Sequence, residues 1–366
     1  MMTIRRLIYR EVFAAVVFVA AGFLALFFFF DFVDELPNVG KGVTTYRLTQ
    51  ALVYVSLMVP NHLYELLPIA VLIGTIFVMA RLAQSSEYTI LRTSGLEPWR
   101  ALRALLALGM FFALLTFAAG DYLAPAADRA AQLLRAQSQG RISVGQTGAW
   151  LKERQQQHTY NVNVAALSPD GAMQGVRVFE ADERGLLVSM TQAPRATFGN
   201  GIWLLQNAER TLFKSRGTDQ AEVERATLAQ WRWPTGISNE MVAVALLKPD
   251  RMSTIDLFQY INHLEDNGQT SQRYEIEFWR KVFYPLSCLV MVVLALPFAY
   301  LHFRSGGITT YVFGGVLIGI SFFLLNNVFG YIGNLRNWWP WLTAAAPGLI
   351  YSLFSLGAFG WLVLRR

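Results

Sequence analysis

The side chains of this chain best placed to do chemistry lie in a polar segment, Gln84–Arg100, between two strongly apolar stretches. Glu87 and Arg92 can form ion pairs with another protein. A serine ahead of Glu87 can cap the first turn of a short helix, and Gly95 can end that helix in the left-handed conformation. The segment therefore predicts a short charged helix that docks a partner protein.

Two further residues of this segment, Tyr88 and Leu91, fall on one face of the expected helix, because residues three apart are neighbours on a helix. Such a face suits a groove on a partner. The alternative is an ordinary basic loop whose arginines only set the orientation of the chain in a membrane. Periodicity leaves both interpretations open.

The composition indicates a membrane protein. The chain has 366 residues, of which 54% are apolar and 15% charged, and this is too apolar for a soluble protein of its length. The formal net charge of +6 could suggest nucleic acid as a partner. However, no basic cluster is interleaved with aromatic residues, and the arginines lie beside apolar stretches. We therefore expect a membrane environment and no nucleic acid.

The sequence offers no set of residues for catalysis or for a metal. Its single cysteine, Cys288, lies in an apolar stretch, so an intrachain disulfide is excluded and a cysteine-based metal site is not expected. There is no Gly-x-x-x-x-Gly-Lys-[Ser/Thr] loop for nucleotide phosphates. We predict that the chain is not an enzyme and holds no cofactor, and that any ATP chemistry belongs to another chain.

Six apolar stretches are long enough to cross a membrane. The predicted spans are Val12–Phe30, a second that begins near Pro60 and is centred on Leu66–Ala80, Ala104–Gly120, Val282–Leu301, Ile308–Leu335 and Trp338–Leu364. A cleaved signal peptide is the alternative for the first span, but its apolar run is longer than usual and no small-residue cleavage site follows. The positive-inside rule puts the arginine-rich ends in the cytoplasm, together with the polar segment.

Between the third and fourth spans the periodicity changes to that of β-strands. Tyr160, Val162 and Val164 alternate with asparagines, and further strands are predicted around residues 176–178, 201–204 and 230–233. An amphipathic helix is predicted over Ser253–Asp266, where Ser253 and Asp256 can form a capping box. The sequence therefore predicts a soluble all-β domain on the side opposite the polar segment.

These features fit two classes of protein. One is a transporter subunit whose cytoplasmic helix docks a motor, and the other is a membrane-anchored scaffold or sensor whose β domain binds something outside. Six spans without a nucleotide-binding domain suit either class. Secondary transport is disfavoured, because no pair of broken, charged spans in an inverted repeat is visible.

Four segments carry a resemblance to a known family. They are Phe32-Val33-Asp34-Glu35-Leu36, Gln84-Ser85-Ser86-Glu87-Tyr88 with Ser94-Gly95, Leu133-Leu134-Arg135-Ala136-Gln137, and a run from Gly268 to Ser287 that includes Arg273-Tyr274, Phe278-Trp279 and Lys281. In order and spacing they resemble the permease family of the lipopolysaccharide export system, LptF/LptG, from end to end. The details are closer to the LptG branch, with the LptF branch as the alternative.

The resemblance implies an α-helical membrane protein with six transmembrane helices and an inserted periplasmic β-jellyroll. The expected domains are residues 1–124 with the first three helices and the coupling helix near 84–95, residues 125–268 with the β-jellyroll and its connector helices, and residues 269–366 with the last three helices. It also implies a permease subunit of an ABC transporter in the bacterial inner membrane. That transporter extracts lipopolysaccharide and passes it to a periplasmic bridge toward the outer membrane.

The partners implied by the resemblance are four kinds of protein and one lipid. They are a second, LptF-like permease, two copies of an LptB-like cytoplasmic ATPase that binds the ATP, an LptC-like single-span bridge protein, an LptA-like periplasmic jellyroll protein, and lipopolysaccharide. For coupling to the ATPase, the resemblance assigns Glu87, Tyr88, Leu91, Arg92 and Gly95.

For lipid binding, the resemblance matches Arg135 to a basic position just past the third span, where a guanidinium can pair with a lipid A phosphate. The family's first-span lysine falls on Asp31 here, and a basic residue one turn before Arg135 falls on Gln132. Lys41 then becomes a candidate cation at a shifted position. The alternatives are that Arg135 and Lys41 simply face solvent.

Four apolar side chains would line the cavity for the acyl chains by the same resemblance, namely Phe27, Phe30, Ile318 and Phe322. The alternative for each is packing between helices or contact with membrane lipid. For Asn326, an amide within an apolar stretch, we expect a hydrogen-bond partner on a neighbouring helix.

Overall fold

The computed structural model describes residues 2–40, 46–85, 90, 98–139, 148–168, 170–199, 201–215, 221–300 and 307–361. The chain forms two compact units. The helical unit comprises Met1–Asp34, Met58–Ala127 and Glu275–Arg366, and the sheet unit comprises Glu35–Leu57 and Asp128–Tyr274. The domain boundaries expected after residues 124 and 268 stay a prediction.

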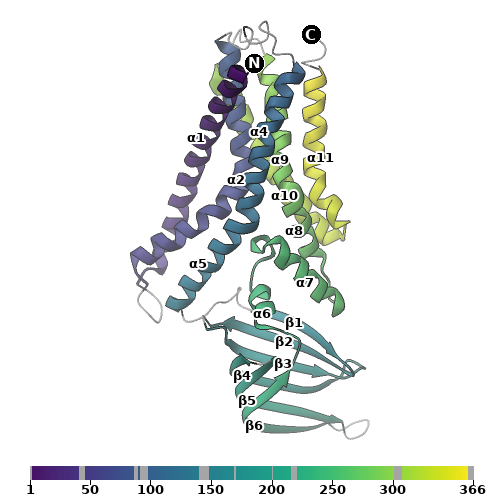
Figure 1. The fold of residues 1–366 in the computed structure, drawn as a ribbon. Coiled ribbons are helices and arrows are strands. Elements are labelled where there is room, and N and C mark those ends of the chain that lie inside the picture. Colours follow the sequence, from purple (N-terminus) through teal and green to yellow (C-terminus); the bar gives the residue numbers. More distant parts are fainter. Residues whose placement is uncertain are drawn as a thin grey trace. The chain divides into compact units, whose positions relative to one another are not determined.

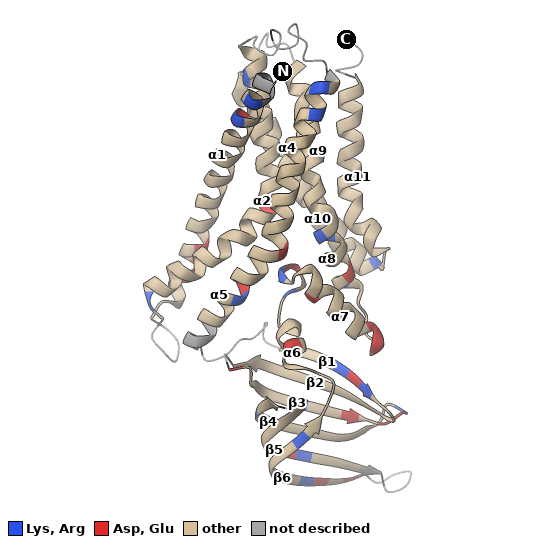
Figure 2. Ribbon diagram, viewed as in Figure 1, with Lys and Arg blue, Asp and Glu red and all other residues tan. Residues whose placement is uncertain are grey.

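Apolar helices make up most of the helical unit (Figure 1). They are α1 (Met2–Glu35), α2 (Leu48–Gln84), α4 (Pro98–Ala118), α9 (Ser287–Ala295), α10 (Ile308–Arg336) and α11 (Pro340–Phe359), and the charged helix α8 (Gln272–Phe283) accompanies them. A π-helical turn, Ala119–Leu123, joins α4 to α5 (Ala124–Gln139). The described residues contain six helical stretches long and apolar enough to cross a membrane, and this confirms the predicted helical membrane fold. Figure 2 shows how few charged residues these helices carry along their lengths.

The predicted start of the second span, near Pro60, is wrong. Helix α2 already begins at Leu48, and both Pro60 and Pro68 lie inside it. In a membrane bundle an internal proline is tolerated, because neighbouring helices and local adjustments satisfy the freed carbonyls.

Two glycines allow α10 to approach α2 closely. A Cβ atom built on Gly315 would lie 2.8 Å from Ile76, and one built on Gly319 would lie 2.7 Å from Ile69. The spacing of four residues puts both glycines on one face of α10, as in the small-xxx-small pattern of membrane helix pairs. Apolar lipid gives little hydrophobic drive to helix association, so this contact depends on close van der Waals packing.

The sheet unit contains one sheet of six antiparallel strands in the order of the chain (Figure 1). The strands are β1 (Ala149–Gln155), β2 (His158–Leu167), β3 (Met173–Ala181), β4 (Leu187–Gly199), β5 (Ile202–Ser215) and β6 (Ala221–Pro234). The four predicted strands correspond to β2, β3, β5 and β6. An inserted β domain between the third and fourth spans is thereby confirmed.

One face of this sheet forms its core. Val162, Val164, Val176 and Val178 alternate inward and are buried, as their spacing predicts. Trp203 is fully buried as well, and its indole nitrogen donates to the carbonyl of Ile237 at 2.8 Å. Apolar side chains of the short helix α6 (Asn239–Ala245) join the same core. The opposite face of the sheet carries exposed residues such as Arg177, Gln192 and Glu209.

The connector helix predicted over Ser253–Asp266 is present as α7 (Thr254–Asp266). Ser253 is its N-cap, and the Ser253 and Asp256 side chains each bond to the other's backbone amide, so the predicted capping box is confirmed. Leu257, Ile261 and Leu264 are buried along one face. Helix α7 is therefore anchored by its apolar face and held at its first turn.

The close approach of α10 to α2 leads to the first prediction. Gly319→Leu should destabilise the helical unit by about 1–3 kcal/mol, because the added side chain overpacks against Ile69. Gly314→Leu is the matched control, since a Cβ atom at Gly314 meets nothing within 4 Å. Denaturant titration of both variants in detergent measures the difference. Equal stabilities would contradict the packing account.

Candidate lipid-binding and coupling sites

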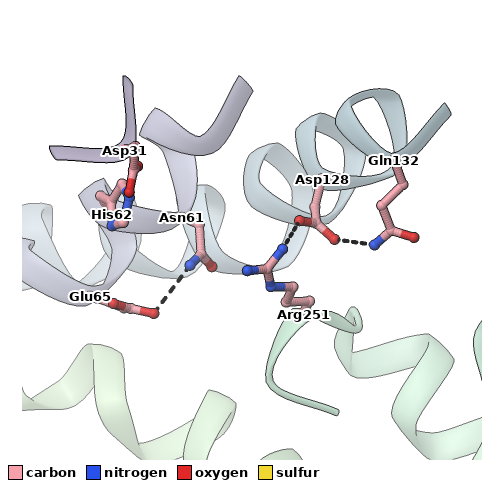
Figure 3. Close-up of polar contacts among 7 residues, drawn as sticks. All are labelled: Asp31, Asn61, His62, Glu65, Asp128, Gln132 and Arg251. Atoms are coloured by element: carbon pink, nitrogen blue, oxygen red, sulfur yellow. Dashed lines mark hydrogen bonds and ion pairs between the residues drawn. The ribbon is translucent and has the colours of Figure 1, made fainter. Parts of the chain in front are cut away.

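A hydrogen-bonded Asp–His pair and an ion pair join α1 to α2 within the helical unit. Asp31 Oδ2 lies 2.6 Å from His62 Nε2 (Figure 3), and Glu11 Oε2 lies 2.7 Å from Arg81 Nη2. Charged side chains in membrane-length helices are costly unless they are paired, so these contacts fix how the two helices align. Asp31 therefore has a partner within the chain. A carboxylate in the place of the family's lysine would repel a phosphate, and we expect no phosphate contact from it.

The two phenylalanines assigned to the first span have different surroundings. The Phe27 ring lies 4.9 Å from the His62 ring, centroid to centroid. Phe30 is 55% exposed, and its ring contacts that of the adjacent Phe29. Phe27 thus supports the Asp31–His62 pair, whereas Phe30 is open to lipid or to a partner helix. Their role in a cavity for acyl chains stays a prediction.

The two candidates on α10 also differ. Ile318 is partly buried against the core of the helical unit, and Phe322 is only 1% exposed. The Phe322 ring packs between Tyr284, at 6.2 Å, and Tyr351, at 5.1 Å between centroids. In this arrangement Phe322 is a packing residue, which was the alternative considered for it. A cavity-lining role for Ile318 and Phe322 stays a prediction.

Two adjacent cations of α8 make internal bonds that the sequence did not indicate. Lys281 is 5% exposed, and its Nζ donates to the carbonyl of Gly120 at 2.7 Å. Gly120 lies in the π-helical turn, where the widened backbone leaves carbonyls available. Arg280 pairs with Glu277 at 2.9 Å and donates to the carbonyl of Asn326 at 2.7 Å. These charges hold helices together.

Asn326 itself is buried, and its amide nitrogen donates to the carbonyl of Phe322 at 3.1 Å, one turn earlier on α10. The neighbouring helix α8 does contact Asn326, but Arg280 of α8 donates to its backbone carbonyl and not to its side-chain amide. The expectation that Asn326 serves packing agrees with this burial. The bond from the amide stays within its own helix.

In the sheet unit, a buried carboxylate organises the start of α5. Asp128 accepts from Arg251 at 2.6 Å through one oxygen and from Gln132 at 2.7 Å through the other (Figure 3). Burial disfavours the charged form of Arg251, but the charge and hydrogen bond of Asp128 outweigh this and raise the pKa of Arg251. Arg129 pairs in turn with Asp256 of α7. Gln132, Arg129 and Arg251 are thus all bonded to carboxylates of the protein.

The remaining candidate residues lie wholly or partly outside the described residues. Arg135 lies on α5, one turn beyond Gln132, and its side chain is outside the described residues. Lys41, Glu87, Tyr88, Leu91, Arg92 and Gly95 also lie outside them. Their roles stay predictions. Gln132 and Arg129 are already bonded within the protein, and the phosphate contact of Arg135 stays a prediction.

Comparison with known proteins bears on the whole chain. The family described as lipopolysaccharide export system permease LptF/LptG matches residues 6–365. The lipopolysaccharide export system permease protein LptG of Escherichia coli K12 is 27% identical over 365 residues, which cover 99% of this chain and 98% of that protein. The protein of the same name from Haemophilus influenzae is 26% identical over 369 residues, covering 100% and 99%.

The second prediction separates the two arginines of α5. Arg135→Gln should weaken capture of a phosphorylated lipid A by about 1.5–3 kcal/mol, the value of a charge-assisted hydrogen bond, with little effect on a dephosphorylated analogue. Arg129→Gln is the control, because it removes the pair with Asp256 and should lower the stability of the protein rather than its phosphate preference. Lipid binding to purified protein measures both. Equal losses for the two lipids in Arg135→Gln would exclude a phosphate role.

Proposed function

Because the chain belongs to the lipopolysaccharide export system permease family LptF/LptG, we propose that it works as one of two permeases in an ABC transporter. It is a multi-pass membrane protein and a lipopolysaccharide export permease. We further propose that a separate ATPase supplies the energy, that the chain lies in the bacterial inner membrane, and that it works with other proteins of the export system. The transporter takes lipopolysaccharide from the bacterial inner membrane and passes it to a periplasmic bridge toward the outer membrane.

The observation that carries the proposal is the central position of α2. The most apolar part of α2 is 78% buried, against 17% for α1 and for α10. It is tied to α1 by the Asp31–His62 and Glu11–Arg81 pairs and to α10 by the glycine contacts. A push on the end of α2 would therefore reach the two helices that are most open to the membrane.

The polar segment that begins at Gln84 is where such a push would enter. Helix α2 ends at Gln84 and α4 begins at Pro98, so the segment connects two packed helices of the helical unit. We assign ATPase coupling to Glu87, Tyr88, Leu91, Arg92 and Gly95 of this segment. Since the sequence has no nucleotide-binding loop, ATP is bound and hydrolysed by two copies of an LptB-like subunit, and this chain needs no cofactor.

The open surfaces of α1 and α10 suit the remaining partners. A permease for an amphiphile needs a lateral opening between helices, because acyl chains would otherwise cross water. We place a second, LptF-like permease and lipid against these helices, with an LptC-like bridge protein and an LptA-like jellyroll protein receiving the lipid in the periplasm. The β domain then lies in the periplasm and the polar segment in the cytoplasm, as the positive-inside rule favours.

The third prediction tests coupling. The tagged wild-type chain should bring down the ATPase together with lipopolysaccharide, identified by mass analysis. Glu87→Arg should copurify at least tenfold less ATPase and stop lipid export, because a reversed charge would face the surface that Glu87 pairs with. Glu183→Arg, an exposed reversal in the sheet unit, is the matched control and should copurify normally.

Two outcomes would overturn this proposal. A Glu87→Arg chain that copurifies ATPase at the wild-type level and exports lipid would exclude the coupling role. A wild-type chain that brings down no stoichiometric ATPase and no lipid A species would instead indicate a membrane-anchored scaffold or sensor.

A further inference from the structure

The face of the sheet opposite its core carries a hollow of about 610 Å³. This volume lies within the range of small-ligand pockets, about 300–1,000 Å³. Its residues come from β1 to β5 of the sheet unit. None of them belongs to the lipid-binding or coupling candidates, so the hollow has no role in the function described so far.

A single row of side chains forms one border of the hollow. The strand register places Trp150 opposite Asn163, Asn163 opposite Arg177, Arg177 opposite Gln192, and Gln192 opposite Glu209. Neighbouring strands lie about 4.8 Å apart, so the row runs for about 19 Å across five strands. It begins with an indole and continues with an amide, a guanidinium, a second amide and a carboxylate.

Small residues beside this row create the depth of the hollow. Ala165, Gly175 and Pro194 line it next to the polar row. Gly175 has a φ of +59°, which favours glycine, and a Cβ atom there would lie 3.0 Å from the Cβ of Ala165. The depression is therefore set by the backbone and by residue size, and it does not depend on a side chain moving away.

Trp150 supplies a flat apolar platform at one end of the row. Its ring stacks on that of Phe179 at 5.8 Å with an interplanar angle of 21°, and the residue is still 52% exposed. One ring face is thus supported by the protein while much of the side chain remains available. An aromatic platform of this kind can hold the apolar face of a sugar ring, whose C–H groups point to one side.

The rest of the row supplies hydrogen-bonding groups of both kinds. Arg177, Gln192 and Glu209 are exposed, and neither Arg177 nor Glu209 makes an ion pair with another residue of the described ranges. Amides both donate and accept, a carboxylate accepts, and the guanidinium fork binds carboxylate or phosphate bidentately. An acyl chain would leave these groups without partners, and an isolated phosphate would leave the indole unused. A saccharide with hydroxyls and an acidic group uses the indole, the guanidinium and the exposed groups of Gln192 and Glu209.

We propose that this hollow binds the oligosaccharide of the exported lipopolysaccharide, with one sugar ring on Trp150 and an acidic substituent on Arg177. Gln192 and Glu209, both exposed, then read the hydroxyl groups along the row. The proposal rests on the proposed function for the source of the saccharide. The site adds recognition of the sugar portion of the substrate, whereas the other substrate-binding candidates of this chain all concern its lipid portion.

The test uses full-length protein in a detergent without a sugar headgroup, so that the detergent does not compete. Lipid-free oligosaccharide released from lipopolysaccharide by mild acid should bind, with saturation transfer to its ring protons and a dissociation constant from calorimetry. Trp150→Ala and Arg177→Gln should each weaken binding at least tenfold, and Trp150→Phe should weaken it less, because a smaller ring still stacks. Arg225→Gln, on exposed β6 and outside the hollow, is the matched control and should bind like the wild type.

Unaltered unfolding curves for these exposed substitutions would show that the losses are local. Absence of oligosaccharide binding, or equal affinities in Arg177→Gln and Arg225→Gln, would overturn the proposal. Binding of peptidoglycan fragments but not of the lipopolysaccharide oligosaccharide would overturn it as well. The measurement needs neither ATPase nor transport, so its failure leaves the coupling proposal intact, and failure of the coupling test leaves this one intact.

Discussion

Charged side chains that enter the apolar bundle must find partners there, and this constraint sets how the helices of the helical unit align. Lys281 bonds to the carbonyl of Gly120, Arg280 to that of Asn326, and Asp31 to His62. Each bond joins residues of two different segments of the bundle. Because an unpaired charge in hydrocarbon is strongly disfavoured, a helix cannot slide by a turn without breaking such a bond. The polar contacts therefore specify the alignment, while apolar packing supplies the close fit.

The same constraint gives α2 its central role. Polar bonds attach α2 to α1, and the carbonyl of Glu65 on α2 accepts from the Tyr284 hydroxyl that follows α8. On its other side, Gly315 and Gly319 bring α10 into contact with α2. Helix α2 thus contacts α1, α10 and the turn that follows α8, while α1 and α10 keep wide apolar surfaces. An arrangement of this kind suits a machine in which the core moves and the exposed helices meet lipid and partners.

Much of this fold follows from local sequence patterns. The six apolar stretches, the alternation of valines around Val162 and Val176, and the capping box of Ser253 were all predicted and are all present. These features depend on hydrophobic length, period and short-range bonding, which one segment carries by itself. The strands β1 and β4 were missed. The buried side chains of β4 include the polar or small Ser189, Thr191 and Ala193, and β4 contains Pro194, while β1 carries the charged run Lys152-Glu153-Arg154.

Long-range partners could not be predicted in this way. Lys281 looks like a flanking cation in the sequence, and its acceptor, Gly120, lies 161 residues away. Asp31 was recognised as a departure from the family's lysine, but the sequence did not indicate that His62 compensates for it. The surroundings of Phe322 could not be predicted either. The pattern of α10 does not distinguish a ring that packs between two tyrosines, as Phe322 does, from a ring that faces a cavity.

The strand order of the sheet has a consequence for how the chain is made. Each described strand pairs with the strand that follows it in sequence, so the loops to be closed are short and their entropy cost is small. Local pairing of this kind favours fast folding. The sheet can therefore grow hairpin by hairpin as the polypeptide emerges, before the last three membrane helices are synthesised. Biogenesis of the β domain then needs no segment that comes later in the chain than its own connector helices.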